Sequence, residues 1–131
     1  MVRRVLIVDD EPNIVTSLEF LMRGGDYEVR VALNGEEALR LAESFRPHLV
    51  LLDVMMPQRS GFEVCQKIRE NPVLRDVKII MLTAKGRDAE RERGLNLGAN
   101  AYVSKPFSTK ELMSTVRGLF PGSERAGPGS P

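Results

Sequence analysis

The chain has 131 residues, 42% of them hydrophobic, and a net charge of +1. This length and hydrophobic content fit one globular domain, and the near-neutral charge argues against direct nucleic-acid binding. A single cysteine, Cys65, excludes an internal disulfide and suits a reducing compartment. No apolar run approaches the ~20 residues of a membrane span, and the one after Arg4 is too short for a secretory signal. We therefore expect a cytoplasmic protein without membrane contact.

Strands and helices are expected to alternate five times along the chain. Apolar runs predict strands over residues 4–8, 27–33, 48–53, 77–82 and 100–103. Apolar spacing and start signals predict helices over residues 12–24, 35–45, 60–70, 87–97 and 108–120. Alternation of this kind is typical of an α/β fold, in which helices cover both faces of a parallel sheet.

Residues typical of helix starts support these helices. Pro12 suits a first helical turn, where a missing N–H does no harm. Asn34, Ser60 and Ser108 each precede a glutamate by three residues, the spacing of a capping box. Every predicted helix except the fourth therefore carries a start signal of its own.

The fourth predicted helix differs from the others, because residues 87–93 are almost wholly charged. Its apolar residues, Leu95 and Leu97, come late. One interpretation is a weakly held helix that is able to move, since most helix stability in proteins comes from packing. The other is a solvated face with ion pairs between residues three and four apart.

The last residues of the chain, 121–131, are rich in glycine, proline and serine and show no periodicity. We expect a disordered tail or linker there. The globular domain is expected to span residues 1–120.

Three acidic residues stand at the exits of predicted strands. Asp9 and Asp10 follow the first strand, and Asp53 closes the third. In an open α/β sheet, ligands bind just beyond the carboxyl ends of the strands. Carboxylates brought together there repel each other unless a hard cation such as Mg2+ neutralises them.

Two further strand ends add a hydroxyl and an ammonium group. Thr83, followed by the small Ala84, comes after the fourth strand, and Lys105 comes after the fifth. Three acids, a hydroxyl and a lysine suit phosphoryl transfer to a carboxylate, because aspartate is a covalent acceptor and Mg2+ offsets charge on phosphoryl oxygens. Each residue alone has a simpler interpretation as a cap, turn former or solvated lysine. The joint placement favours the site.

Several short motifs of the chain belong together. They are Val8–Glu11, Leu52–Pro57, Ser60–Gly61, Leu82–Ala84, Gly98–Ala99 and Lys105–Phe107. Over residues 3 to about 120, the chain resembles the receiver domain of two-component response regulators, the CheY-like family. The resemblance implies a flavodoxin-like, doubly wound (βα)5 sandwich with a parallel five-stranded sheet in the order 2-1-3-4-5.

The resemblance also assigns an acceptor and a metal site. Asp53 resembles the phosphoacceptor, and Asp9 and Asp10 resemble the acidic pair that holds Mg2+, with Asp10 favoured as the direct ligand. Asp53 and the backbone carbonyl of Met55 would complete the protein ligands. Mg2+ is the cofactor that the family implies.

The remaining roles concern switching. Thr83 resembles the switch hydroxyl, and Tyr102 the aromatic that turns inward after phosphorylation; Tyr102 is otherwise an ordinary half-buried strand residue. Lys105 and Ala84 match positions that contact the phosphoryl group. The Lys105–Pro106 bond is similar to one that is cis in the family, which is plausible because cis costs little before proline.

Met55 and Lys85 match positions that tune loss of the phosphoryl group in the family. An apolar side chain at Met55 should hinder an attacking water, so we expect a moderately long-lived phosphoryl state; otherwise Met55 is a gap-filling methionine. Cys65 is interpreted as a core residue, and His48 as a strand-edge residue at the far end from the site.

The family implies partners rather than turnover of a substrate. A histidine kinase or histidine phosphotransfer protein would donate the phosphoryl group, and the face of the fourth helix, fifth strand and fifth helix would control an output partner or an effector domain. Residues 82–86 resemble receivers of winged-helix transcriptional regulators. Arg91 and Glu111 match one charge pair of their dimers, but Asn100 and Thr115 do not match. We expect a monomer or a weak phosphorylation-dependent homodimer.

Three other functions fit these residues less well. A binding module that has lost phosphorylation would not need all of the site residues. A phosphatase with an aspartyl nucleophile would want a second acid close after Asp53, where Val54 and Met55 stand. A flavin carrier would want a phosphate loop after the first strand, where Asp9 to Pro12 is acidic. The chain is therefore interpreted as a signalling receiver, with no catalysis beyond self-phosphorylation and slow autodephosphorylation.

Overall fold

The computed structural model describes residues 2–56, 59–84 and 88–120. The expected tail at 121–131 and the expected tuning residue Lys85 lie outside the described residues. No helix in the described ranges is long and apolar enough to cross a bilayer.

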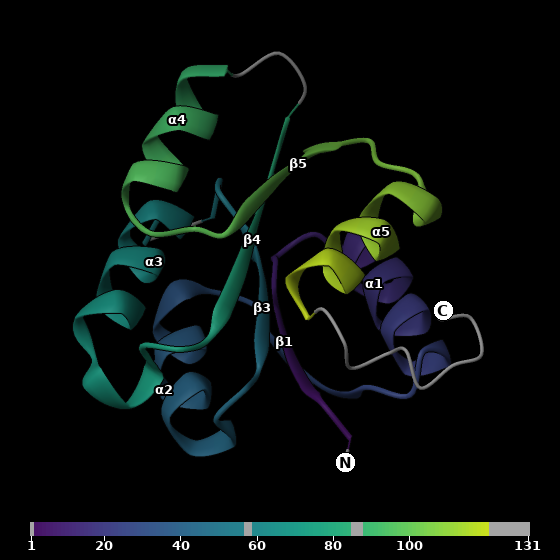
Figure 1. Ribbon diagram of the computed structural model, residues 1–131, viewed down its shortest axis with the longest axis horizontal. Coiled ribbons are helices and arrows are strands. Elements are labelled where there is room, and N and C mark those ends of the chain that lie inside the picture. Colours follow the sequence, from purple (N-terminus) through teal and green to yellow (C-terminus); the bar gives the residue numbers. More distant parts are fainter. Residues whose placement is uncertain (1, 57–58, 85–87, 121–131) are drawn as a thin grey trace.

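A parallel sheet forms the centre of the molecule (Figure 1). Its strands run in the order β2-β1-β3-β4-β5, which confirms the topology predicted from the sequence. The strands are β1 (Arg4–Val8), β2 (Glu28–Ala32), β3 (Leu49–Asp53), β4 (Lys78–Ala84) and β5 (Ala101–Lys105).

Helices cover both faces of this sheet, with α1 and α5 on one side and α2, α3 and α4 on the other (Figure 1). The helices are α1 (Pro12–Gly24), α2 (Gly35–Phe45), α3 (Gly61–Glu70), α4 (Asp88–Asn96) and α5 (Thr109–Leu119). A short 3-10 helix, η1 (Pro72–Leu74), precedes β4.

The predicted helix caps are present. The side chains of Asn34, Ser60 and Ser108 each accept a hydrogen bond from the backbone N–H of the glutamate three residues later. Such a cap contributes about 1 kcal/mol to helix stability. The third and fifth helices begin one residue later than expected, because the capping serine itself keeps an extended backbone.

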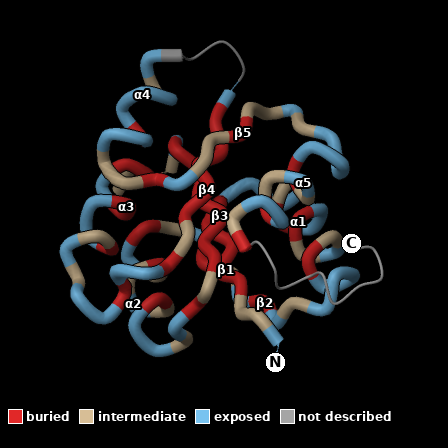
Figure 2. The backbone as a smooth tube through the Cα atoms, in the orientation of Figure 1, coloured by how far each residue is buried: buried red, intermediate tan, exposed pale blue. Residues whose placement is uncertain are grey.

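The strands are the most deeply buried part of the chain, as Figure 2 shows. All residues of β3 are buried, and alternate side chains feed two cores. Leu18 of α1 and Val116 of α5 belong to one core, whereas Phe62 and Ile68 of α3 belong to the other. Sandwiching of this kind fixes the carboxyl edge of the sheet in place.

Two strands run further than hydropathy predicts. β4 continues to Ala84 and β5 to Lys105, because the ladder pairs Thr83 with Ser104 and Ala84 with Lys105. Thr83 and Lys105 therefore lie in the last residues of strands, not in loops. The unexpected η1 has a local cause, since the side chain of Asn71 accepts from the N–H of Val73 and Pro72 begins the turn.

Helix α4 is mostly exposed, which agrees with both interpretations of its charged sequence, a weakly held helix and a solvated face. Among residues 89–96, whose burial is described, only Gly94 is buried. A Cβ at Gly94 would lie 3.4 Å from the Cγ atom of Met81, so this turn is in close contact with β4. The remainder of the helix has little apolar surface with which to hold the sheet.

Candidate functional site

The three acids meet at the carboxyl edge of the sheet. β1 and β3 are neighbours, and Val8 pairs with Leu52, so Asp9 and Asp53 leave the sheet side by side. Asp9 is fully buried and Asp53 is 5% exposed, whereas Asp10 is exposed. One carboxylate oxygen from each of the three lies within 4.8 Å of the others. The structure thus brings together the acidic residues predicted to meet.

Lys105 bridges the two buried carboxylates. Its Nζ lies 3.1 Å from Oδ2 of Asp9 and 3.3 Å from Oδ1 of Asp53. The other oxygen of Asp9 accepts from the backbone N–H of Glu11 at 2.9 Å, and Oδ1 of Asp53 accepts from that of Met55 at 3.4 Å. One ammonium group thus faces two buried carboxylates, and the cluster keeps an excess of negative charge.

That excess is expressed in the pKa values of the site. Burial raises the pKa of Asp53 from 3.8 to about 6; Asp9 adds to the rise, and Lys105 opposes it. Burial alone would lower the pKa of Lys105, but Asp53 and Asp9 raise it above its usual value. Asp53 is therefore an acid whose ionised form gains from any further positive charge placed nearby.

The donor set fits a hard divalent cation. Mg2+ prefers oxygen ligands and is bound through one or two carboxylates while keeping several waters. The exposed Asp10 lies next to the buried pair, which suits a site open to solvent on one side. A divalent charge would offset the negative excess that raises the pKa of Asp53.

Thr83 belongs to the opposite face of the sheet from Asp53. Leu82 pairs with Asp53 and lies in the core under α1 and α5, so Thr83, the next residue, turns toward α4. Its side chain is buried, and its hydroxyl donates to Oε1 of Glu90 in α4 at 2.5 Å. No motif or spacing in the sequence marks Glu90, because its contact with Thr83 depends on the approach of α4 to the sheet.

Tyr102 lies on the same face as Thr83. It is half-buried and packs against the core that contains Phe62 and Met81. Met81 pairs with Tyr102 across β4 and β5. The two expected switch residues are thus close in the sheet and both face α4, on the side away from the buried acids.

Gly61 allows the start of α3 to lie against the backbone of Asp53 and Val54. A Cβ at this position would collide with the backbone carbonyl oxygen of Asp53 and lie 2.9 Å from Cα of Val54. The N–H of Gly61 donates to the carbonyl oxygen of Val54 at 2.9 Å. The Ser60–Gly61 motif therefore has a steric reason: the start of α3 touches the backbone that carries Asp53.

Three other expectations can be placed. The Lys105–Pro106 bond is cis, as the resemblance implied. Met55 is 60% exposed, and Ala84 is exposed at the end of β4, so both border the carboxyl edge. Cys65 is buried in the core, as expected, and its thiol lies 3.7 Å from the carbonyl oxygen of Leu97.

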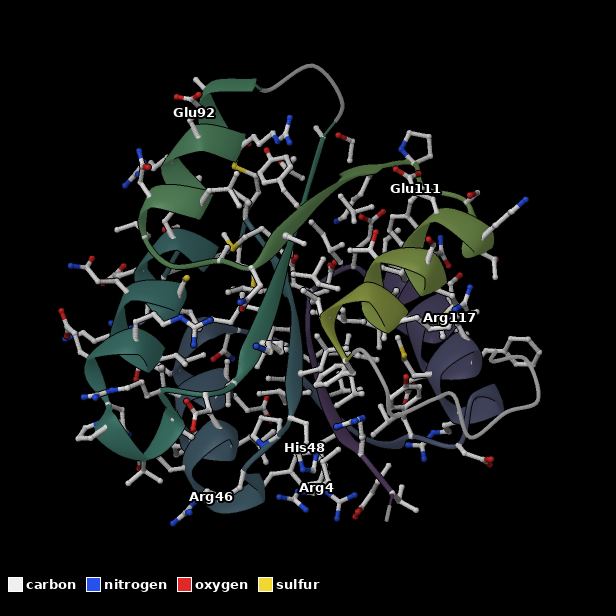
Figure 3. The ribbon with its side chains drawn as sticks, in the orientation of Figure 1. Arg4, Arg46, His48, Glu92, Glu111 and Arg117 are labelled. Carbon is white, nitrogen blue, oxygen red and sulfur yellow. The ribbon has the colours of Figure 1, made fainter. Side chains whose placement is uncertain are left out.

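His48 lies at the opposite end of the sheet, beside Arg4 and Arg46 (Figure 3). The backbone N–H of Arg4 donates to its Nδ1 at 2.9 Å, and its own N–H donates to the carbonyl oxygen of Arg4. Burial, followed by the charges of Arg4 and Arg3, lowers the pKa of His48. The histidine thus links β1 to β3 as a neutral acceptor, far from the acids.

The parallel α/β sandwich and its acidic carboxyl edge agree with the receiver class that the sequence predicts, and comparison with known proteins specifies the family. The family model described as "Response regulator receiver domain" matches residues 5–117. The chain belongs to this family of signalling receiver domains.

Individual relatives agree. The chain is 42% identical, over 99% of its length, to the alkaline phosphatase synthesis transcriptional regulatory protein PhoP of Bacillus subtilis, of which it covers 53%. The chemotaxis response regulator CheY4 of Vibrio cholerae superposes with a TM-score of 0.86 at 30% identity, covering 92% of this chain and 100% of that one. The receiver domain of a sensor histidine kinase from Pseudomonas aeruginosa, solved with a magnesium ion in its active site cleft, gives 0.83 at 33% identity, covering 91% and 98%.

The chain spans about half the length of the curated relatives it matches. The similarity thus concerns the receiver part of those proteins.

Proposed function

We propose that Asp53 accepts a phosphoryl group from a histidine kinase or a histidine phosphotransfer protein, and that this modification switches the face formed by α4, β5 and α5. The observation that carries the proposal is the position of Asp53. It is a nearly buried carboxylate at the carboxyl end of β3, with Nζ of Lys105 3.3 Å away and two further acids beside it.

In the transfer step, an oxygen of the Asp53 carboxylate attacks the phosphorus atom of a phosphohistidine. The P–N bond breaks, its electron pair goes to the imidazole, and an acyl phosphate forms on Asp53. Lys105 binds a phosphoryl oxygen as a point charge. Asp10, Asp9, Asp53 and the carbonyl of Met55 would hold Mg2+, which when bound offsets negative charge on the phosphoryl oxygens.

The phosphoryl group adds charge and strong acceptor oxygens to the carboxyl edge. The hydroxyl of Thr83 would donate to one of these oxygens, with Ala84 in contact, and Tyr102 would turn inward in the space near Thr83. Such contacts favour one of two pre-existing conformations, which changes the affinity of the α4–β5–α5 face for its output. The face shared by Thr83, Tyr102 and α4 supports this route.

We take residues 1–120 as the receiver unit and 121–131 as a tail or linker. The match to about half of a transcriptional regulatory protein supports an effector region as the output, and a separate output partner is the alternative that the sequence leaves open. The lone buried thiol of Cys65 suits the cytoplasm.

Asn100 supports a monomer or a weak homodimer. Its side-chain oxygen accepts from the backbone N–H of Ile79 and from Nη2 of Arg69, both at 2.8 Å. The residue is engaged within its own chain and brings no charge to the α4–β5–α5 face. Because one pair of opposite charges is missing, two copies of the chain should associate more weakly through that face.

Intact-protein mass spectrometry after incubation with Mg2+ and acetyl phosphate, or with phosphoramidate as a P–N donor, tests the proposal. We expect a labile gain of about 80 Da, one phosphoryl group on a carboxylate, in the wild type and in the exposed-residue control Asp76→Ala. The Asp53→Ala variant should show none. A wild type that stays unmodified with both donors, or an Asp53→Ala variant that is modified equally, would contradict the assignment.

A further inference from the structure

Thr83 has a hydrogen-bond partner that the acceptor site does not include. Its hydroxyl donates to Oε1 of Glu90 in the first turns of α4, at 2.5 Å, while the side chain as a whole is 1% exposed. A hydroxyl carries one proton and can donate it to one acceptor at a time. A Thr83 that donates to Glu90 is therefore unable to donate to a group on Asp53.

We propose that Glu90 is a positioning residue that restrains the switch: the Thr83–Glu90 hydrogen bond, here called the latch, holds the unphosphorylated conformation and has to break when Thr83 turns to a phosphoryl oxygen. This inference rests on the proposed function. Glu90 does not touch the reacting atoms. The strength of its hydrogen bond to Thr83 determines how much free energy is needed to release Thr83 when a phosphoryl group binds at Asp53.

The chemistry and the burial of the latch both make its hydrogen bond strong. A hydrogen bond to a carboxylate is about twice as strong as one between neutral groups. Thr83 is buried, so a hydroxyl without an acceptor would lose its hydration with nothing in exchange. Glu90 is only partly buried, so its carboxylate keeps contact with solvent and does not depend on Thr83 for its hydration. The two states thus differ in which acceptor takes the Thr83 proton.

The latch also explains how α4 registers events at Asp53. Of the described part of α4, only Gly94 is buried, so the helix has little apolar contact with the sheet. The bond from Glu90 to Thr83 ties the first turn of α4 directly to a strand residue beside the acceptor site. When Thr83 turns to a phosphoryl oxygen, this tie between α4 and β4 is lost, and the position of α4 on the sheet responds to the state of Asp53.

The test uses beryllium trifluoride with Mg2+ as a non-covalent phosphoryl mimic, and isothermal titration calorimetry to measure its affinity. Glu90→Ala should bind the mimic roughly tenfold more tightly than the wild type, because one charge-assisted hydrogen bond no longer opposes binding. Glu90→Gln, which keeps a weaker acceptor, should lie between the two. Glu92→Ala removes the same charge from the outer side of α4 (Figure 3) and should stay within about twofold, as an exposed control.

A double-mutant cycle separates the latch from a general effect on stability. With Thr83→Ala the donor is absent, so adding Glu90→Ala should no longer tighten binding. Unchanged or weaker binding by Glu90→Ala, or equal tightening in the Thr83→Ala background, would overturn the inference. If Glu90→Ala fails to fold, the Glu90→Gln variant decides by the same criterion. A wild type that does not bind the mimic would instead contradict the proposed function itself.

Discussion

The raised pKa of Asp53 makes a quantitative prediction for the protein without metal. In the folded state Asp53 holds its proton up to about pH 6, whereas its ordinary pKa is 3.8. The folded form therefore binds more protons than the unfolded form between these values, and stability falls as pH rises through this window. The contribution of Asp53 is fully present below 3.8 and is lost above about 6.

The magnitude follows from the same two values. A rise of the Asp53 pKa from 3.8 to about 6, at 1.36 kcal/mol for each pKa unit, corresponds to at most about 3 kcal/mol. Asp53→Asn removes the charge but keeps an oxygen that can accept from Lys105. In EDTA, the variant should match the wild type near pH 4 and exceed its free energy of unfolding by up to about 3 kcal/mol at pH 7.

Urea unfolding from pH 4 to pH 8 measures this difference. Asp76→Asn, at an exposed site, should differ from the wild type by less than about 0.5 kcal/mol throughout. Millimolar Mg2+ should shrink the advantage of Asp53→Asn, because a bound cation favours the carboxylate and stabilises the folded state by mass action. A difference that does not change with pH, or a wild type more stable than Asp53→Asn at pH 7 in EDTA, would refute the reasoning.

Three further outcomes follow from other parts of the molecule. Gly61→Ala should destabilise the fold by about 1–3 kcal/mol in urea unfolding and slow phosphoryl labelling, because the added Cβ meets the backbone of Asp53. At Gly118 a Cβ meets nothing within 4 Å, so Gly118→Ala should instead stabilise the fold by about 0.5–1 kcal/mol. Equal effects of the two substitutions would disprove the steric argument. Burial lowers the pKa of His48, so this residue contributes stability above its ordinary pKa of 6.5, and that contribution is lost as pH falls. Between pH 7 and pH 5, the wild type should therefore lose stability relative to His48→Gln in matched denaturation curves. Parallel curves would contradict this. Met55→Asn should speed loss of the phosphoryl group, followed by intact mass after desalting, and an unchanged rate would show that this exposed side chain does not impede water.

The acidic edge was predictable because it depends on local signals. Apolar runs that end in acids identify the exits of buried strands, and parallel strands bring their exits to one edge. Asp9, Asp10 and Asp53 therefore met as expected. The same locality made the caps at Ser60 and Ser108 predictable, since each pairs with a residue three positions away.

What escaped prediction depends on contacts between distant elements. The apolar run in the sequence ends at Leu82, but β4 continues to Ala84 because the neighbouring β5 offers backbone pairing partners there. Strand alternation could have placed Thr83 on the α4 face. Its bond to Glu90 could not be foreseen, because it depends on how closely a weakly packed helix approaches the sheet.

The loose attachment of α4 has a consequence for how such a domain can diversify. Arg91 and Glu92 are exposed on a helix that contributes little to either core. Substitutions there usually change stability by less than about 0.5 kcal/mol. The surface offered to a partner can therefore be rewritten residue by residue while the acidic edge and the fold stay intact. Partner recognition and folding therefore depend on largely separate sets of residues, so substitutions that create a new partner preference need not destabilise the protein.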